Sequence, residues 1–204
     1  MPFYDIYSDD VRCGRGAVKS GAGIKTAEVF AGDEVGFVVG RSAMETCQPL
    51  EPHVIYHNGP GQAYLSRSTT VHVRDYEGEG DWFKISYLGA TNDTWWLTRG
   101  QTGMNFTIPA TTPPGQYLLR VEHLYVRYPL GTTQFYIACA QVDVFRPPGR
   151  GVTVAKTPDP EYMARFPGAY QLSDEGINVP EYMYDWPNSR LMEYKPPGPP
   201  MWTR

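Results

Sequence analysis

The side chains best suited to metal or acid–base chemistry in this sequence are its four histidines, His53, His57, His72 and His123. His53 and His57 are four residues apart, a spacing that on a helix would let both imidazoles hold one metal ion. The Gly59-Pro60 pair that follows disfavours a helix, so we expect a loop or a strand end there. Spacing alone therefore indicates ordinary surface or core histidines.

Other catalytic patterns are missing from the sequence. It has no GxSxG turn, no GxGxxG loop, and no CxxC or HxxxH pair that stands beside a second such pair. The acidic residues Asp75, Glu77, Glu79 and Asp81 lie in a glycine-broken stretch, where a solvated turn is the simplest interpretation. Tyr136 by itself is interpreted as an ordinary strand residue.

Composition narrows the class of protein. Of 204 residues, 20% are charged and 41% are hydrophobic, which is neither disordered nor membrane-like. The net charge of -4 and the scattered Lys and Arg give no basic surface, so we expect neither nucleic acid nor a membrane as partner. The length suits one domain. The 15 Tyr and 5 Trp would suit stacking on sugar rings, although such rings more often fill a core.

The elements that must position these side chains are expected to be short strands. Gly and Pro punctuate the chain every few residues, several runs alternate apolar and polar residues, and no segment keeps a helical apolar spacing over three turns. These patterns predict an all-β fold, an immunoglobulin- or fibronectin-III-like antiparallel β-sandwich with long loops. The expected strands are 25–29, 34–39, 63–65, 82–85, 105–108, 116–125 and 134–145.

Residues 146–204 have a different texture, rich in Pro and Tyr and poor in periodicity, after a linker-like RPPGRG stretch. This segment is either a disordered tail or a long ordered loop lying along the sandwich. Its many aromatic residues favour the ordered loop, because disordered tails are usually poor in aromatics. We expect residues 1–204 to form a single domain that includes this loop.

Seven short strings carry a family resemblance when they are read in order. They are SDDVRC ending at Cys13, HNGP from His57 followed by AYL, WFKI at 82–85, PGQYLLRVEH at 114–123, QFYIACAQ at 134–141, FPGAY at 166–170 and PGP at 197–199. Together they resemble the auxiliary activity family nine lytic polysaccharide monooxygenases, formerly glycoside hydrolase family sixty-one, over essentially the whole chain.

The resemblance implies one copper ion held by a histidine brace. His57 matches the second histidine of that brace, Tyr136 the axial tyrosine, and Gln134 the glutamine beside the metal, so Gln134 and Tyr136 are candidate catalytic residues. Three nitrogens in a T-shaped arrangement suit copper. Cys13 and Cys139 match the family's disulfide, whereas Cys47 has no counterpart.

The resemblance also implies partners and a location. We expect cellulose or another β-1,4-glucan as substrate, an external electron donor, and secretion of a monomeric protein, although Met1 to Asp5 does not begin a signal peptide. Tyr194 is the candidate for a tyrosine on the cellulose-binding face. The alternative is that Tyr194 only packs the tail onto the sheet.

Two departures from the family pattern leave two functions open. The matched region lacks the family's N-terminal strand and first histidine, so the copper site is expected to be incomplete. Arg127 stands where the resemblance implies a histidine that is near the copper without binding it, and an arginine stays protonated. His123 is a conceivable substitute, which the expected strand register disfavours. The chain is therefore predicted to be a copper-dependent monooxygenase, or alternatively a catalytically inactive polysaccharide-binding relative.

Two Asn-X-Thr triplets, at Asn92 and Asn105, would be glycosylation acceptors in a secreted protein. Such triplets are common by chance and indicate little by themselves.

Overall fold

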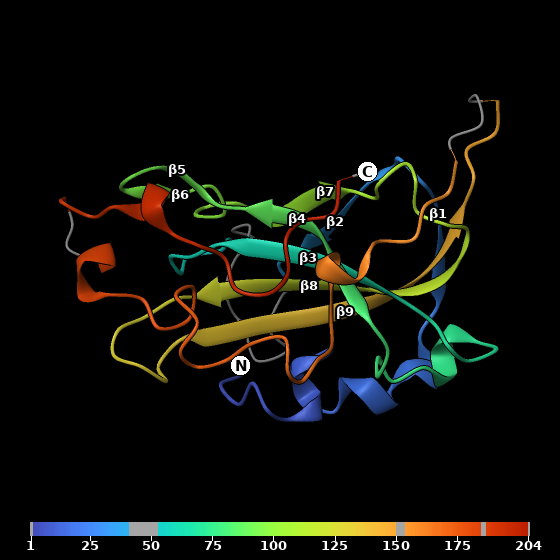
Figure 1. Ribbon diagram of the computed structural model, residues 1–204, viewed down its shortest axis with the longest axis horizontal. Coiled ribbons are helices and arrows are strands. Elements are labelled where there is room, and N and C mark those ends of the chain that lie inside the picture. Colours follow the sequence, from blue (N-terminus) through green and yellow to red (C-terminus); the bar gives the residue numbers. More distant parts are fainter. Residues whose placement is uncertain (1, 41–52, 150–153, 185–186, 204) are drawn as a thin grey trace.

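The computed structural model describes residues 2–40, 53–149, 154–184 and 187–203 (Figure 1). Strands dominate these residues, and their longest helical element is the four-residue 3-10 turn η6 (Glu181–Tyr184). The expected all-β sandwich is therefore confirmed. Within the same residues no helix has the length and apolar character needed to cross a membrane. Cys47 and Trp186 lie outside the described residues.

A six-stranded sheet forms the larger layer. Its strands, in spatial order, are β1 (Thr26–Phe30), β9 (Gln134–Phe145), β8 (Gly115–Tyr125), β3 (Gly61–Arg67), β4 (Trp82–Leu88) and β10 (Met163–Ala164). Strands β8 and β9 pair along their lengths, and Figure 1 shows them side by side across the molecule. All the pairs are antiparallel except β1–β9, which no hairpin connects, so its direction is not constrained by a tight turn.

The second layer is smaller. Strand β2 (Glu34–Val38) pairs with β7 (Gly103–Thr107), and β5 (Ala90–Asn92) forms a separate hairpin with β6 (Trp95–Trp96). Gly32, with φ of 95°, and the Asp33 carboxylate, which accepts a hydrogen bond from the Phe30 amide, turn the chain from β1 into β2. All seven strands expected from periodicity are present, whereas β5, β6 and β10 are too short for alternation to reveal.

Successive side chains of β8 point to opposite faces of the larger sheet, and each face has its own core. Tyr117, Leu119 and Val121 join a core shared with β2 and β7. On the opposite face, Leu118 and Leu124 pack in a core built largely from N-terminal and C-terminal segments.

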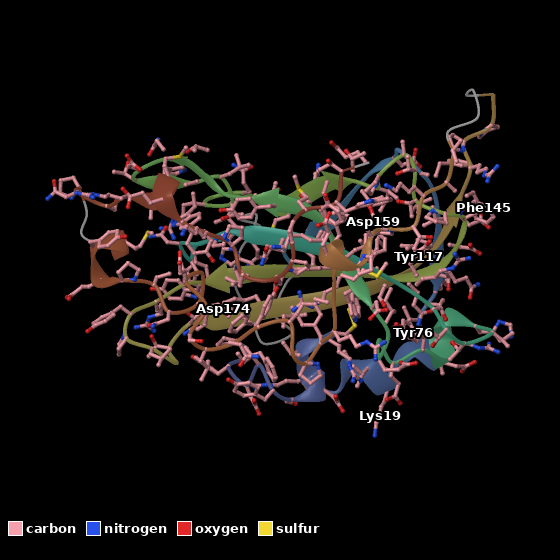
Figure 2. The ribbon with its side chains drawn as sticks, in the orientation of Figure 1. Lys19, Tyr76, Tyr117, Phe145, Asp159 and Asp174 are labelled. Atoms are coloured by element: carbon pink, nitrogen blue, oxygen red, sulfur yellow. A yellow bond between two sulfur atoms is a disulfide. The ribbon has the colours of Figure 1, made fainter. Side chains whose placement is uncertain are left out.

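Short 3-10 turns line this opposite face. On the N-terminal side are η1 (Asp9–Val11), η2 (Ala17–Lys19) and η3 (Gly21–Gly23), followed later by η4 (Val73–Asp75). They form the blue and green coils at the lower edge of Figure 1, and Figure 2 shows Lys19 extending away from them and Tyr76 beside η4. On the C-terminal side are η6 and η7 (Leu191–Glu193), whereas Tyr162 of η5 (Pro160–Tyr162) packs against the core shared with β2 and β7.

Much of the Pro- and Tyr-rich segment packs against the sheet, beginning with Phe166. Phe166, Tyr170, Ile177 and Val179 are at most 2% exposed and belong to the same core as Tyr64 of β3. Figure 1 shows the orange and red chain crossing the sheet before it ends beside β4. Aromatic side chains thus hold a segment that has almost no regular secondary structure.

Candidate functional site

His57 lies in the loop that leads into β3, and this loop is anchored on several sides. Ile55 exchanges backbone hydrogen bonds with Gly100 and Gln101, and the Thr98 hydroxyl donates to the Gly59 carbonyl at 2.6 Å. Gly59, with φ of 157°, lies so close to β8 that a Cβ atom there would be 1.7 Å from the Leu124 carbonyl oxygen. Only glycine therefore allows this loop to hold His57 against the end of β8.

Tyr136 and Gln134 lie on the same face of β9, two residues apart. The Tyr136 hydroxyl donates to Oε1 of Gln134 at 2.8 Å, and Nε2 of Gln134 donates to the Tyr4 hydroxyl at 2.9 Å. The Tyr136 ring lies 5.5 Å from the His57 ring, centroid to centroid. The structure thus brings His57, Gln134 and Tyr136 together, as the sequence predicts.

Two residues that sequence reasoning did not select complete this cluster. Tyr125 stacks on His57 with ring centroids 4.2 Å apart, and Tyr4 fixes the amide of Gln134. Tyr125 pairs with Gln134 across β8 and β9, so a correct strand register would have revealed it. Tyr4 lies in the N-terminal segment, where Phe3 forms an isolated bridge with Phe135 of β9. No local sequence pattern predicts that Tyr4 contacts Gln134.

Electrostatics keep the cluster uncharged near neutral pH. Partial burial, followed by the positive charges of Arg99 and Arg127, lowers the pKa of His57, so the imidazole favours its neutral, metal-binding form. Burial, followed by the nearby Tyr56 and Tyr4, raises the pKa of Tyr136 to about 12. The Tyr136 phenol therefore keeps its proton and donates a hydrogen bond to Oε1 of Gln134.

Arg127 is exposed at the end of β8, and its guanidinium lies 5.3 Å from the Tyr125 ring centroid. Its positive charge helps to lower the pKa of His57, and an arginine offers no neutral imidazole.

His123 is placed differently from what the sequence suggested, because the register pairs it directly with Tyr136. Its ring lies 6.1 Å from the Tyr136 ring, and burial lowers its pKa to about 4. Neither ring nitrogen has a hydrogen-bond partner of normal geometry within the described chain, although backbone groups of His57 and Pro60 are near. The register therefore places His123 beside Tyr136, and whether it substitutes for the expected histidine stays a prediction.

A cavity of about 340 Å³ opens beside this cluster. Its walls are mostly apolar and come from the end of β2, the start of β7 and the facing parts of β8 and β9, including Val38, Met104, Val121, His123 and Ala138. Tyr136 and His57 are also among the lining residues, so the candidate site borders this apolar cavity.

Tyr194 occupies a position that does not suit sugar stacking. It is only 7% exposed, its ring packs edge-on against Trp96, and its hydroxyl donates to the Gly176 carbonyl at 2.7 Å. The prediction of a surface tyrosine is corrected here, because the apolar ring is buried where the C-terminal segment meets β6. This is the packing role that the sequence left open.

The disulfide between Cys13 and Cys139 is present, as predicted. It ties the segment after η1 to the strand that carries Gln134 and Tyr136.

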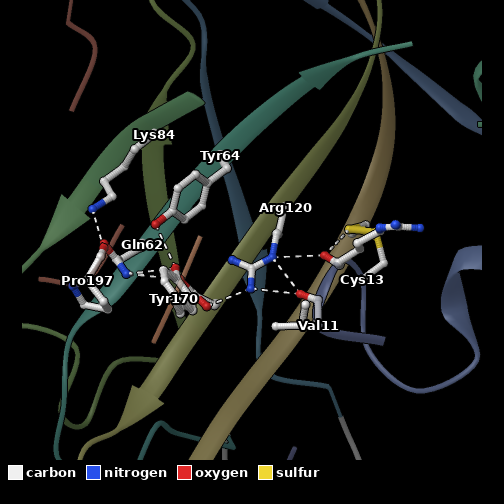
Figure 3. Close-up of polar contacts among 11 residues, drawn as sticks. Val11, Cys13, Gln62, Tyr64, Lys84, Arg120, Tyr170 and Pro197 are labelled. Carbon is white, nitrogen blue, oxygen red and sulfur yellow. Dashed lines mark hydrogen bonds and ion pairs between the residues drawn. A yellow bond between two sulfur atoms is a disulfide. The ribbon is translucent and has the colours of Figure 1, made fainter. Parts of the chain in front are cut away.

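A buried polar network lies on the opposite face of β8 (Figure 3). Arg120 and Glu122 are both fully buried and paired at 2.8 Å. Arg120 also donates to the carbonyl of Val11 at 3.0 Å, and Glu122 accepts from the hydroxyl of Tyr170 and from Gln62 at 3.0 Å. The partners of Arg120 and Glu122 lie in the N-terminal segment, in β3 and in the C-terminal segment. The network therefore connects the sheet to both ends of the chain.

The described residues fit a copper site only in part. The neutral imidazole of His57 and the phenol of Tyr136 are suitable donors. However, no group of three or more His, Cys, Asp or Glu side chains able to hold a metal ion exists in the described part of the chain. His57 and Tyr136 could therefore hold the ion, and further nitrogen donors would have to come from elsewhere.

An all-β sandwich that brings a half-buried histidine, tyrosine and glutamine together defines a candidate metal-dependent enzyme class, which comparison with known proteins makes specific. The model of Auxiliary Activity family 9 (formerly GH61) matches residues 1–190. AA9 family lytic polysaccharide monooxygenase U of Thermothielavioides terrestris is 41% identical over 99% of this chain and 76% of its own. Monooxygenase C of Emericella nidulans is 37% identical over 99% of this chain and 79% of its own.

Solved structures of polysaccharide monooxygenases are also similar to this chain. The crystal structure of HiLPMO9B has a TM-score of 0.76 and 25% identity, covering 100% of this chain and 84% of that one. A cellulose-active polysaccharide monooxygenase from M. thermophila has a TM-score of 0.74 and 25% identity, covering 99% and 83%. The chain belongs to the AA9 family, whose members cleave polysaccharides oxidatively.

Proposed function

We propose that this chain takes part in copper-dependent oxidative cleavage of cellulose or a related β-1,4-glucan, with the copper ion at His57 and Tyr136. The observation that carries this proposal is the joining of His57, Tyr136 and Gln134 at one rim of the sandwich, in a family of polysaccharide monooxygenases. When bound there, copper would supply the redox chemistry that activates oxygen or peroxide with electrons from an external donor.

The chain's own residues would hold and orient the reactants. The neutral His57 imidazole, stacked on Tyr125, would present a nitrogen in a fixed direction. Tyr136 stays protonated, and its hydrogen bond holds the Gln134 side chain, whose other end is held by Tyr4. Gln134 is thereby oriented as a polar group beside the proposed ion.

Exposed tyrosines around the cluster support polysaccharide binding. Tyr4 is 45%, Tyr56 64% and Tyr128 53% exposed, and Tyr4 and Tyr56 lie close enough to Tyr136 to raise its pKa. Flat aromatic faces with polar edges suit the faces of sugar rings. In place of Tyr194, we propose Tyr56, next to the candidate copper ligand, as a sugar-stacking residue.

The copper site is proposed to be incomplete within residues 1–204, and secretion and a monomeric state are likewise proposed. Two observations favour an alternative function, a catalytically inactive polysaccharide-binding relative. Arg127 replaces the expected neutral imidazole, and the described residues contain no three-ligand cluster.

The experiment incubates the copper-loaded protein with cellulose and a reductant and measures oxidised oligosaccharides by mass spectrometry. Oxidised products that disappear in His57→Ala but persist in His72→Ala, an exposed histidine on η4's side of the molecule, support the enzyme. Binding to cellulose without oxidised products, from wild type as well as His57→Ala, contradicts it and supports the inactive relative.

A further inference from the structure

The β5–β6 hairpin presents a rigid Asn-Asp-Thr triplet at the surface. Asp93 and Thr94 form its two-residue turn, and Asn92 and Thr94 are both exposed. The Asp93 carbonyl accepts hydrogen bonds from the Ser189 hydroxyl at 2.7 Å and from the Leu191 amide at 3.2 Å. The C-terminal segment thus holds this turn in one conformation.

Within the triplet, the side chains adopt an arrangement suited to modification of the asparagine. Oδ1 of Asn92 accepts hydrogen bonds from the backbone amide of Thr94 at 2.8 Å and from the Thr94 hydroxyl at 2.9 Å. Nδ2 of Asn92 has no hydrogen bond within the described part of the chain, so it is available to solvent. Two hydrogen bonds thus hold Oδ1 of Asn92, whereas its Nδ2 faces no partner in the described part of the chain.

The second triplet differs in both respects. Asn105 lies inside β7, where Nδ2 donates to the Glu34 carboxylate at 3.3 Å. Its amide oxygen faces the neighbouring strand so closely that a Cβ atom on Gly36 would lie 2.2 Å from it. Asn92 is therefore the triplet whose amide nitrogen is uncommitted.

Trp95 lies directly opposite Asn92 in the hairpin register and is 52% exposed. Side chains opposite each other in an antiparallel pair lie about 5 Å apart at Cβ, on the same face. A sugar attached to Asn92 would therefore have an indole face beside it, and stacking would cover apolar surface that is otherwise in water.

We propose that Asn92 is an N-glycosylation site and that its first N-acetylglucosamine packs on Trp95. In the transfer, Nδ2 of Asn92 forms a bond to the anomeric carbon of a lipid-pyrophosphate-linked oligosaccharide. The anomeric carbon–oxygen bond breaks, the lipid pyrophosphate leaves with the bonding electrons, and the amide loses one proton. The inference rests on the proposed secretion, but not on copper binding or catalysis.

The test expresses the full chain behind a cleavable secretion leader in yeast, in an Asn105→Gln background so that any N-glycan reports on Asn92. Peptide mapping after treatment with peptide N-glycosidase should find Asn92 converted to aspartate. The glycan should be lost in Asn92→Gln and in Thr94→Ala, and kept in Thr94→Ser. An unmodified Asn92 in the secreted, folded protein would overturn the proposal.

A second measurement tests the contact with Trp95. Protein trimmed to one N-acetylglucosamine should melt about 2 °C above the Asn92→Gln variant, and this difference should vanish when both carry Trp95→Ala. A melting difference that survives Trp95→Ala would contradict stacking while leaving the modification in place. Both readouts are independent of copper, so they fail or succeed separately from the proposed function.

Discussion

The two faces of the six-stranded sheet differ in how their buried polar groups are hydrogen-bonded. On one face, Arg120 and Glu122 are fully buried, and their partners come from three other chain segments. On the other face, His123 has no hydrogen bond of normal geometry within the described chain, and a cavity of about 340 Å³ lies beside it. The first face is held by hydrogen bonds between segments, although Nη1 of Arg120 and Oε1 of Gln62 have no partner within the described residues. The second face places the unpartnered His123 ring next to the candidate site and the cavity.

The two ends of β9 also differ in how fully one face of the strand is covered. Val142 and Val144, on the cavity-side face, are at most 2% exposed, whereas Ala138 on that face is exposed. The covered end supports the fold, and the uncovered end carries Tyr136. The candidate site therefore borders a part of β9 whose cavity-side face is not fully covered.

The largest effect is expected from breaking the network. Glu122→Gln leaves Arg120 buried without its opposite charge and should lower the free energy of unfolding by about 3–5 kcal/mol. Urea denaturation measures this. The double change Arg120→Met with Glu122→Leu should cost much less than the single change. The control, Asp81→Asn, removes an exposed ion pair with Arg165 and should cost under about 1 kcal/mol. Equal losses for Glu122→Gln and Asp81→Asn would remove the basis of the comparison.

A matched pair on β9 sharpens the contrast between its two ends. Val142→Ala leaves a space in a closed core and should cost roughly 2–3 kcal/mol. Ala138→Val adds volume where a cavity already exists and should change the free energy of unfolding by less than about 0.5 kcal/mol. Thermal melting of both variants measures this. If Ala138→Val is as destabilising as Val142→Ala, the cavity side is as tightly packed as the covered end.

The pH dependence of stability tests whether Lys84, on the same face of the sheet as Arg120 and Glu122, is buried. Burial lowers its pKa from 10.5 to about 8, so between pH 8 and 10 the unfolded chain binds more protons than the folded one. Stability from this group is therefore lost as the pH falls through that window, by about 2 kcal/mol. Wild type should gain stability relative to Lys84→Met as the pH rises from 8 to 10, measured by urea denaturation. Parallel pH profiles for the two proteins would show that Lys84 is solvated.

Above about pH 10, the buried tyrosines on the face of the sheet that carries Arg120 and Glu122 should lower the stability of the fold. Burial raises the pKa of Tyr64 and Tyr170 well above 10, so above about pH 10 the unfolded chain loses these protons first and stability falls. Alkaline unfolding followed by circular dichroism should be shifted to higher pH in Tyr64→Phe, once its lower starting stability is taken into account. No change in its pH dependence would contradict burial of the phenol.

Much of this fold could be predicted from the sequence, because period-two alternation is a local signal. The seven longer strands, such as 116–125 and 134–145, were all indicated by it. The short strands β5, β6 and β10 could not be, since two or three residues carry no period. The parallel β1–β9 pair was missed because its partners are far apart in the chain.

The site was predictable only through ordered family strings. His57, Gln134 and Tyr136 each look ordinary locally, and it is the long pairing of β8 with β9 that brings His123 and Tyr125 beside them. Tyr194 was misplaced because proximity to the Pro-rich stretch at 196–199 says nothing about which side of the ring is covered. Its burial depends on Trp96 and Gly176, which no local pattern connects to it.

The most direct test of the central claim, that His57 and Tyr136 form the copper site, is electron paramagnetic resonance of the protein titrated with Cu²⁺. We expect a bound-copper spectrum with nitrogen coupling that is lost in His57→Ala and altered in Tyr136→Phe, while His72→Ala is unchanged. A spectrum that His57→Ala leaves intact would contradict the assignment of the site.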